Sequence, residues 1–313
     1  MIGRAANTAC LVSAACRVMG WAMARTRFPF RLAACRLAAR RLAVSLPILM
    51  VAMGAAPVPQ KARAPHRIMS LNLCADQLLL ALADRDQIAG LTRYATDPQM
   101  SAAAQEARGL PIMDGSAEAV IAANPDLVIG MPARRNPAIM LLKSRNYPAV
   151  DLQSAESYAA ILDSIRTVAQ AVGHPARGEA LIARMNADLA KLPKPARRPV
   201  MAYYQRRGFL TGAGTLVDEL MTRVGATNLA VKLGKPALSQ MSLEEMIAAR
   251  PDYLVVESAT DQVVDQGTEM LHHPALSRIP RISIPQAWTV CGGPAYVRAA
   301  RAMATAIAAP ARR

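Results

Sequence analysis

The side chains best suited to bind a ligand in this sequence follow predicted strands. Tyr94 follows the apolar segment 88–92, and Arg134 and Arg135 follow the apolar segment 127–130. In open α/β sheets, ligands bind beyond the carboxyl ends of the parallel strands, so these three side chains lie on candidate binding loops. Guanidinium groups suit carboxylate or catecholate oxygens through charge-assisted hydrogen bonds, although two loop arginines are also typical of a solvated surface.

The sequence lacks the residue patterns of common catalytic and metal centres. No nucleophile elbow, HExxH, CxxC or paired-carboxylate motif occurs. The adjacent His272 and His273 would diverge by about 100° on a helix, so they could not hold a metal together. Residues 212–215 could hold an anion at a helix start, but they lack the lysine of a P-loop, and a plain turn is the simpler interpretation. We therefore expect binding rather than catalysis, and no metal site.

The net charge of +15 over 313 residues is unevenly distributed. Residues 1–56 hold eight arginines and no acidic residue, which leaves +7 for the rest, without a basic run. This distribution argues against a nucleic-acid partner. Basic residues up to Arg41 precede an apolar segment, 42–56, with a small-residue end, which is the layout of a secretory signal peptide. The segment is short for a membrane span, although an N-terminal anchor is the alternative.

We therefore expect a periplasmic protein that is secreted through this leader. No cysteine directly follows the apolar segment, so no lipid anchor is expected; the export route, general or twin-arginine, stays open. Beyond the leader the chain has two cysteines, Cys74 and Cys291. An oxidising compartment allows a disulfide between them, but the sequence does not say whether they approach within bonding distance.

Two segments, 116–129 and 242–255, have the same pattern. Each begins with Ser, has Glu two residues later (Glu118 and Glu244), and continues with Ile-Ala-Ala, a Pro-Asp pair and an apolar run. Ser is a common helix N-cap, a first-turn Glu complements the helix dipole, and a proline ends the helix. Each segment is thus predicted to be a short helix, a tight turn and a buried parallel strand, which indicates two similar α/β lobes.

The rest of the chain can be divided around these segments. Pro175 begins a long helix with an apolar face that is placed to bridge the lobes. We also expect a helix opened by Ser154, a loop at 205–214 and a helix near 267–275. The predicted units are a leader (1–56), a lead-in (57–66), an N-terminal α/β lobe (67–174), a linking helix (175–192) and a C-terminal α/β lobe (198–309).

Four segments in order are 67–71, Glu118 with 124–128, 214–220 with Gly225 and Asn228, and 242–244 with 250–252. With these segments, the chain from His66 onward resembles the iron-chelate and vitamin B12 periplasmic-binding proteins of ABC importers. The resemblance implies an α/β fold of two lobes bridged by a single long helix, with the ligand cleft between the lobes (the class III periplasmic-binding-protein fold).

The resemblance also implies roles for particular residues. Glu118 and Glu244 would dock onto arginines of the permease, although both could merely complement helix dipoles, and the neighbouring Glu245 competes for the second role. Cys74 and Cys291 would lie on cleft-facing loops, one from each lobe, where a disulfide would restrict opening, free thiols could touch the ligand, or both could simply be small buried residues. The side chains placed near the cleft are Tyr94, Arg134, Arg135, Tyr204, Arg206, Phe209 and Trp288.

The implied function is that of a monomeric substrate-binding protein without enzyme activity or a permanently bound cofactor. It would capture a metal chelate and deliver it to the dimeric, membrane-embedded permease subunits of an ABC importer. Aromatic residues are scarce, with three Phe, seven Tyr and two Trp, and two pairs of arginines favour a ferric siderophore. The first alternative is a corrinoid (vitamin B12) or haem receptor, because aromatics suit flat apolar ligands. An exported enzyme or metal-processing protein on the same scaffold is the second.

Overall fold

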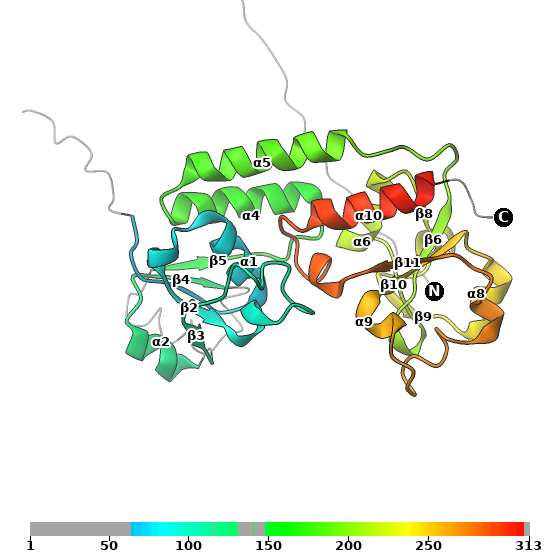
Figure 1. Cartoon of the computed structure of the whole chain (residues 1–313), viewed down its shortest axis with the longest axis horizontal. Helices are drawn as coiled ribbons and strands as arrows, with labels where there is room; N and C mark the ends of the chain where they lie inside the picture. Colours follow the sequence, from blue (N-terminus) through cyan, green and yellow to red (C-terminus); the bar gives the residue numbers. More distant parts are fainter. Residues whose placement is uncertain (1–63, 115, 131–139, 141–147, 310–313) are drawn as a thin grey trace, which may run out of the picture. The chain divides into compact units, whose positions relative to one another are not determined.

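The structure is a computed structural model that describes residues 64–114, 116–130, 140 and 148–309 (Figure 1). The chain divides into two units, residues 1–59 and 60–313, and every described residue belongs to the second. The predicted leader, 1–56, therefore lies outside the described residues. In the described part, no helix has the length and apolarity needed to cross a membrane.

Two parallel sheets form the centres of two lobes. The N-lobe is the sheet with strand order β3-β2-β1-β4-β5 and its helices, and the C-lobe is the sheet with order β11-β10-β6-β8 and its helices. The N-lobe elements are β1 (Ile68–Ser70), α1 (Leu73–Leu82), β2 (Ile88–Thr92), β3 (Ile112–Met113), α2 (Ala117–Ala123), β4 (Leu127–Gly130), β5 (Ala149–Asp151) and α4 (Tyr158–Ala171). The expected α/β fold with two lobes is confirmed.

The C-lobe adds a small antiparallel sheet, β7-β9, to its parallel one. After the helix α5 (Pro175–Ala190), the elements are β6 (Val200–Tyr203), β7 (Phe209–Thr211), α6 (Leu216–Arg223), β8 (Thr227–Asn228), α7 (Leu229–Lys232), β9 (Leu238–Gln240), α8 (Leu243–Ala249), β10 (Tyr253–Glu257), α9 (Ser258–Asp261), β11 (Arg281–Ile284) and α10 (Tyr296–Ala308).

The repeated segments fold as predicted, and the structure explains their Pro-Asp pairs. Each helix ends on a residue in the left-handed region, Asn124 at φ 44° and Arg250 at φ 45°, which turns the chain sharply before the proline. Asp126 then accepts the Arg67 backbone N–H at 2.9 Å, and Asp252 accepts the Val200 N–H at 2.7 Å. In both lobes, the aspartate therefore holds the start of the neighbouring central strand.

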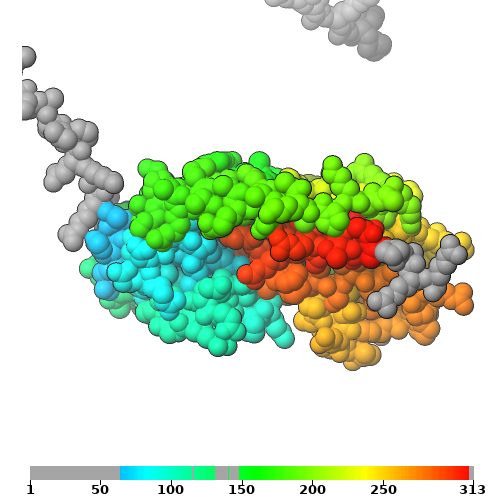
Figure 2. Space-filling view, turned by 45° about the horizontal axis from the view of Figure 1, so that its top comes forward, coloured from blue at the N-terminus to red at the C-terminus, as the bar shows by residue number. Residues whose placement is uncertain are grey.

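The long helix α5 packs against α4 of the N-lobe and α10 of the C-lobe. Figure 1 shows α5 in green alongside α4 and α10, and Figure 2 shows it lying next to the red helix α10. One buried cluster runs through this helical layer and contains residues of both sheets, including Ile68 and Ile282. The apolar face of α5, with Ile182 and Met185 buried, explains why a single helix joins both lobes.

Three expectations for individual elements were wrong. Ser157, not Ser154, caps α4, and its side chain accepts the Ala160 N–H. The expected loop 205–214 contains the strand β7. The segment 267–275 forms turns instead of a helix, because Asp265 accepts the backbone N–H groups of Gly267 and Thr268 in a local turn, and a proline at 274 forces an extended residue before it.

Candidate ligand-binding cleft

A cavity of about 260 Å³ lies between the two lobes. Pro98 and Gln99, from the loop after β2, form its N-lobe wall. The C-lobe wall comes from residues that follow β10 and β11, namely Ser258, Ala259, Gln262, Pro285 and Gln286. In Figure 2 this is where the turquoise and the gold and orange surfaces meet. The carboxyl ends of both sheets thus face one cavity, which is the expected ligand position in parallel α/β sheets.

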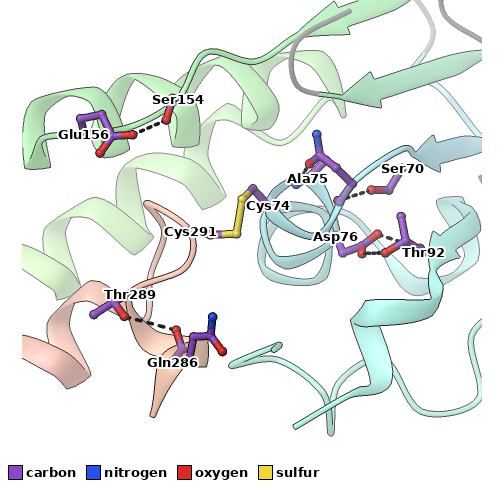
Figure 3. Close-up of a disulfide and its surroundings, with 11 residues drawn as sticks. Ser70, Cys74, Ala75, Asp76, Thr92, Ser154, Glu156, Gln286, Thr289 and Cys291 are labelled. Atoms are coloured by element: carbon purple, nitrogen blue, oxygen red, sulfur yellow. Dashed lines mark hydrogen bonds between the residues drawn. A yellow bond between two sulfur atoms is a disulfide. The ribbon is translucent and has the colours of Figure 1, made fainter. Parts of the chain in front are cut away.

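A disulfide between Cys74 and Cys291 joins the two lobes (Figure 3). Cys74 lies in the first turn of α1, and Cys291 lies between β11 and α10, with a Cα–Cα distance of 5.3 Å. The cysteines line a second cavity of about 60 Å³ together with Glu156 and Thr289. Of the alternatives that the sequence left open, the structure therefore contains the disulfide, and neither sulfur is a free thiol.

Further contacts also join the two lobes, and we call them the cross-lobe seam. Glu156 of the N-lobe accepts the Leu216 backbone N–H at 3.2 Å, so a carboxylate already occupies the start of α6. The rings of Tyr158 and Tyr296 lie 5.3 Å apart, and the Arg223 guanidinium lies 4.5 Å from the Tyr158 ring centre. Desolvation by burial raises the pKa of both tyrosines, which keeps them neutral.

Asp76 is a fully buried carboxyl group on the N-lobe side. It accepts the Thr92 backbone N–H at 3.0 Å and the Thr92 hydroxyl at 2.5 Å, which fixes α1 to the carboxyl end of β2 (Figure 3). Burial raises the pKa of Asp76, and its hydrogen bonds with Thr92 and Ser70 oppose that shift. The group therefore positions the loop that carries the N-lobe wall and does not itself face the cavity.

Glu257, the last residue of β10, lies at the equivalent edge of the C-lobe. Its Oε1 accepts the Gln205 side-chain amide at 3.2 Å and the Tyr203 hydroxyl at 3.3 Å. The Tyr203 hydroxyl also lies 3.4 Å from the Thr289 hydroxyl. No ion pair neutralises Glu257 among the described residues. The C-lobe edge therefore presents a carboxylate supported by neutral hydrogen-bond donors.

The expected ligand residue Tyr94 is exposed, on the loop after β2. The Arg93 Nη2 donates to the Tyr94 hydroxyl at 2.7 Å, and the same guanidinium stacks 4.8 Å from the centre of the ring. Arg206 is exposed too, but its Nη2 donates to both carboxylate oxygens of Asp265, at 3.1 and 2.8 Å. This hydrogen bond is the main cause of the lowered pKa of Asp265. A ligand must therefore compete with Asp265 for Arg206.

Tyr204 is fully buried, and its hydroxyl donates to the Met241 carbonyl at 2.9 Å. Side chains alternate between the faces of a strand, so the preceding residue, Tyr203, is the one that reaches Glu257. This placement corrects the expectation for Tyr204, whose ring has no free face for a ligand. Burial raises its pKa to about 12.

The other expected cleft residues have different surroundings. Phe209 is half-buried on β7, where it pairs with Gln240. Trp288 is half-buried against the shared core cluster, two residues after the cavity residue Gln286. Arg134 and Arg135 lie outside the described residues. The sequence analysis did not name five residues that lie on or beside this region of the structure, although each is on a loop or strand end that follows a predicted strand. They are Arg93, Gln99, Gln205, Glu257 and Gln286.

Both predicted docking glutamates, Glu118 and Glu244, are exposed in the first turns of α2 and α8. Glu245 differs from them, because it accepts the Ser242 backbone N–H at 2.8 Å and pairs with Lys235 at 2.9 Å. The backbone hydrogen bond with Ser242 is the largest cause of its lowered pKa. Glu245 therefore has a structural role in capping α8, which distinguishes it from its neighbour.

The residues that the structure describes contain no group of three or more His, Cys, Asp and Glu placed to hold a metal ion. His272 lies 2.9 Å from the Val263 carbonyl oxygen through Nε2, and His273 accepts the Ala275 N–H through Nδ1. These two histidines thus take part in local turns. Together, the two facing sheets, the cavity and the tied lobes define a two-lobed ligand-binding protein.

Comparison with known proteins gives the family. A family model described as "Periplasmic binding protein" matches residues 68–282, and the chain belongs to this family. The family consists of binding proteins, which confirms the expectation that this protein binds a ligand rather than catalyses a reaction. A cobalamin-binding protein of Halobacterium salinarum is 25% identical over 206 residues, which is 64% of this chain and 56% of the relative, so the chain spans little more than half of that protein.

Solved structures agree with the fold. The periplasmic heme-binding protein RhuT from Roseiflexus sp. RS-1 has a TM-score of 0.62 and 27% identity, over 78% of this chain and 98% of that one. The periplasmic vitamin B12 binding protein BtuF of Vibrio cholerae has a TM-score of 0.57 and 18% identity, over 78% and 97% of the two chains.

A further sequence relative is a Bacillus subtilis ABC transporter substrate-binding lipoprotein, YvrC, which is described as uncharacterized. It is 24% identical over 218 residues, which is 66% of this chain and 67% of the relative.

Proposed function

We propose that this protein is the extracytoplasmic substrate-binding component of an ABC importer and that it captures a metal tetrapyrrole, cobalamin or haem. The observation that carries the proposal is the cavity at the carboxyl ends of two facing parallel sheets, in a chain of the periplasmic binding protein family. The reported relatives are described as binding cobalamin or heme. These names favour a tetrapyrrole over the ferric siderophore that the arginine pairs had favoured.

Residues close in sequence to the cavity lining would offer complementary contacts to such a ligand. Tyr94, on the loop that leads to Pro98, and Trp288, two residues after Gln286, would supply aromatic faces for a flat macrocycle, and a phenol oxygen is one of the ligands that proteins use for haem iron. The Arg93 Nη2 already donates to the Tyr94 hydroxyl, which orients this oxygen within the loop after β2. Glu257 and Gln205 would accept and donate hydrogen bonds to amide groups at the edge of a corrinoid.

A titration with four ligands tests the ligand class. Haemin, aquocobalamin, a ferric hydroxamate siderophore and a ferric catecholate siderophore are each added to the purified protein, and their absorption spectra are followed. We expect saturable one-to-one binding of a tetrapyrrole and none of the siderophores. Siderophore binding without tetrapyrrole binding would overturn the proposal.

The Tyr94→Phe variant distinguishes the two tetrapyrroles. If haem is the ligand, this variant should lose the charge-transfer band of a phenolate-bound ferric haem and bind haem at least about tenfold more weakly. If cobalamin is the ligand, the ring of residue 94 serves only for stacking, which phenylalanine retains, and the affinity should change little. Tyr253→Phe, at the amino end of β10, is the matched control and should bind as the wild type does.

We also propose that Glu118 and Glu244 hold the permease, one on each lobe. Two exposed carboxylates at equivalent first-turn positions suit a pseudo-symmetric partner with basic side chains. The double variant Glu118→Ala, Glu244→Ala should bind ligand normally and fail to support import. The control, Glu179→Ala with Glu269→Ala, removes two other exposed carboxylates and should import normally. Normal import by the first variant would exclude this role.

For export, we propose that the segment 1–56 acts as a secretory signal. Its arginine-rich start and the apolar segment that follows support this role, and no cysteine directly after that segment offers a lipid attachment site. Fractionation of cells that express the full chain should place a shortened protein in the periplasmic fraction. Recovery of the full-length chain in the membrane fraction would favour an anchor instead.

A further inference from the structure

A cavity of about 130 Å³ lies where α1 and the segment 102–106 of the N-lobe meet the start of α10 in the C-lobe. It is separate from the ligand cavity described above, with which it shares no lining residue. The volume is several times the roughly 30 Å³ share of a water molecule and half that of the ligand cavity. This cavity therefore suits a small molecule.

One wall carries a buried hydrogen-bond donor without a partner. Gln77, on α1, is 5% exposed, and its side-chain Nε2 is buried without a hydrogen bond in the described structure. Buried donors are almost always paired, because an unpaired one loses its hydration without compensation. Since Gln77 lines the cavity, an acceptor held in that cavity would satisfy it.

Two side chains of opposite charge line the same cavity. Arg298, in the first turn of α10, uses Nη1 to donate to the Ala102 carbonyl at 3.1 Å, which leaves other N–H groups of its guanidinium. Glu106, on the N-lobe side, is exposed, and no ion pair joins it to Arg298. The remaining lining is small and apolar and consists of Leu80, Ala81, Ala102, Ala103, Pro294 and Ala295.

We propose that this cavity binds a small zwitterion, namely an amino acid with a short aliphatic side chain. Its carboxylate would accept hydrogen bonds from Gln77 and Arg298, its ammonium group would pair with Glu106, and its side chain would pack on the alanines and leucine. This ligand would give each polar side chain of the lining, Gln77, Glu106 and Arg298, a partner. Because the walls come from both lobes, an occupant also bridges them, one helical turn along α1 from Cys74.

The test is calorimetric titration of the purified protein with L-valine, together with the side-chain amide resonances of Gln77 in ¹H–¹⁵N spectra. We expect saturable binding and a shift of these resonances. Gln77→Leu, which keeps most of the volume and removes the donor, should weaken binding about tenfold or more. Gln170→Leu, the same change at an exposed position of α4, should bind valine as the wild type does.

Two valine derivatives test each charge separately. N-acetylvaline lacks the ammonium group and valinamide lacks the carboxylate, so both should bind at least about tenfold more weakly than valine. Glu106→Gln should weaken valine and leave N-acetylvaline unchanged or improved. The proposal is overturned if valine gives no saturable binding, if Gln77→Leu binds as tightly as the wild type, or if either derivative binds as well as valine.

Discussion

The two helix–turn–strand segments, α2 with β4 and α8 with β10, are alike at their amino ends and different at their carboxyl ends. In both, a serine caps the helix, a left-handed residue ends it, and the aspartate after the proline holds the neighbouring strand. At the far end of the second copy, however, Glu257 and Tyr203 form a polar cluster, while the first sheet presents Ser70 at the position of Tyr203.

The difference separates what builds the lobes from what would recognise a ligand. The repeated contacts are hydrogen bonds of backbone groups that every βα unit must satisfy, so they recur in both lobes. The loops after the strands carry no such constraint and diverge, with Tyr94 and Arg93 on one side and Glu257 and Gln205 on the other. The segments that flank the cavity therefore differ: a cationic and aromatic pair precedes its N-lobe wall along the chain, and a carboxylate precedes Ser258 of its C-lobe wall.

The largest effect should come from removing the link between the lobes. The disulfide joins residues that are 217 positions apart, and loops of this length contribute about 2–5 kcal/mol to stability. The double variant Cys74→Ser, Cys291→Ser should lose about that much free energy of unfolding, measured by urea denaturation in comparison with the oxidised wild type. Equal stability would mean that the cross-lobe seam alone holds the lobes together.

The two aspartates of the repeated segments allow a direct comparison. Asp252 has a 27% exposed side chain and accepts both the Val200 N–H and the Arg197 guanidinium. Asp126 is exposed, and within the described part of the chain its side chain accepts backbone N–H groups without an ion pair. Asp252→Ala should cost about 1–3 kcal/mol of unfolding free energy, and Asp126→Ala less. If Asp126→Ala lost more unfolding free energy than Asp252→Ala, in thermal or urea unfolding, this account of the two aspartates would be contradicted.

A pH profile sharpens the same comparison. The hydrogen bond from Arg197 is the largest cause of the lowered pKa of Asp252. The ionised group therefore stabilises the fold above its unfolded pKa of about 3.9, and this contribution is lost as pH falls through the lower folded value. Asp252→Asn should remove that part of the acid-dependent loss of stability, as measured by urea unfolding between neutral and acid pH. If Asp252→Asn left the pH dependence of the unfolding free energy unchanged, ionised Asp252 would not be a source of the acid-dependent loss.

The cross-lobe seam can be tested at two adjacent glycines. A Cβ on Gly292 would lie 2.4 Å from the Ala155 carbonyl oxygen of the other lobe, while one on Gly293 would meet nothing within 4 Å. Gly292→Ala should therefore cost about 1–3 kcal/mol of unfolding free energy, as overpacking does. Gly293→Ala is the matched control and should be close to the wild type. Similar values for both would argue that the lobes do not meet at this point.

The smallest effect concerns the left-handed residues. Arg250 occupies this region at φ 45° without the short polar side chain that lets Asn124 adopt it. Arg250→Gly should therefore raise the unfolding free energy by up to about 1 kcal/mol, and Asn124→Gly by less. The comparison is made by thermal unfolding. A loss of stability in Arg250→Gly would show that its side chain contributes more than its backbone strain removes.

Much of the fold was readable in the sequence because the repeated segments carry their own start and stop signals. Ser116, Ser242 and the two prolines gave the bounds of α2 and α8 closely, and Pro175 gave the start of α5. The segment 267–275 was harder, because its turns depend on the side chain of Asp265, which also pairs with Arg206. The predicted helix there was wrong for this reason.

The site was less readable than the fold. The rule that ligands bind beyond strand ends placed Tyr94 on a loop after a strand, where the structure has it, and its role as a ligand residue stays a prediction. The resemblance did not distinguish Tyr203 from Tyr204, because strand alternation had to be placed to within one residue. The partner of Arg206, Asp265, lies 59 positions along the chain, where no local pattern reveals it. The rule that ligands bind beyond strand ends would have pointed to Glu257, if it had also been used for the strand of the second repeated segment.

Fluorescence of Trp288 tests the central claim, that the ligand binds between the carboxyl ends of the two sheets. Trp288 is the only tryptophan beyond the predicted leader, and it lies two residues from the cavity residue Gln286. With the leader removed, titration with haemin or aquocobalamin should quench its emission saturably at one ligand per protein. Saturable binding by absorption that leaves the Trp288 emission unchanged, after correction for inner-filter loss, would contradict a ligand site in this cleft.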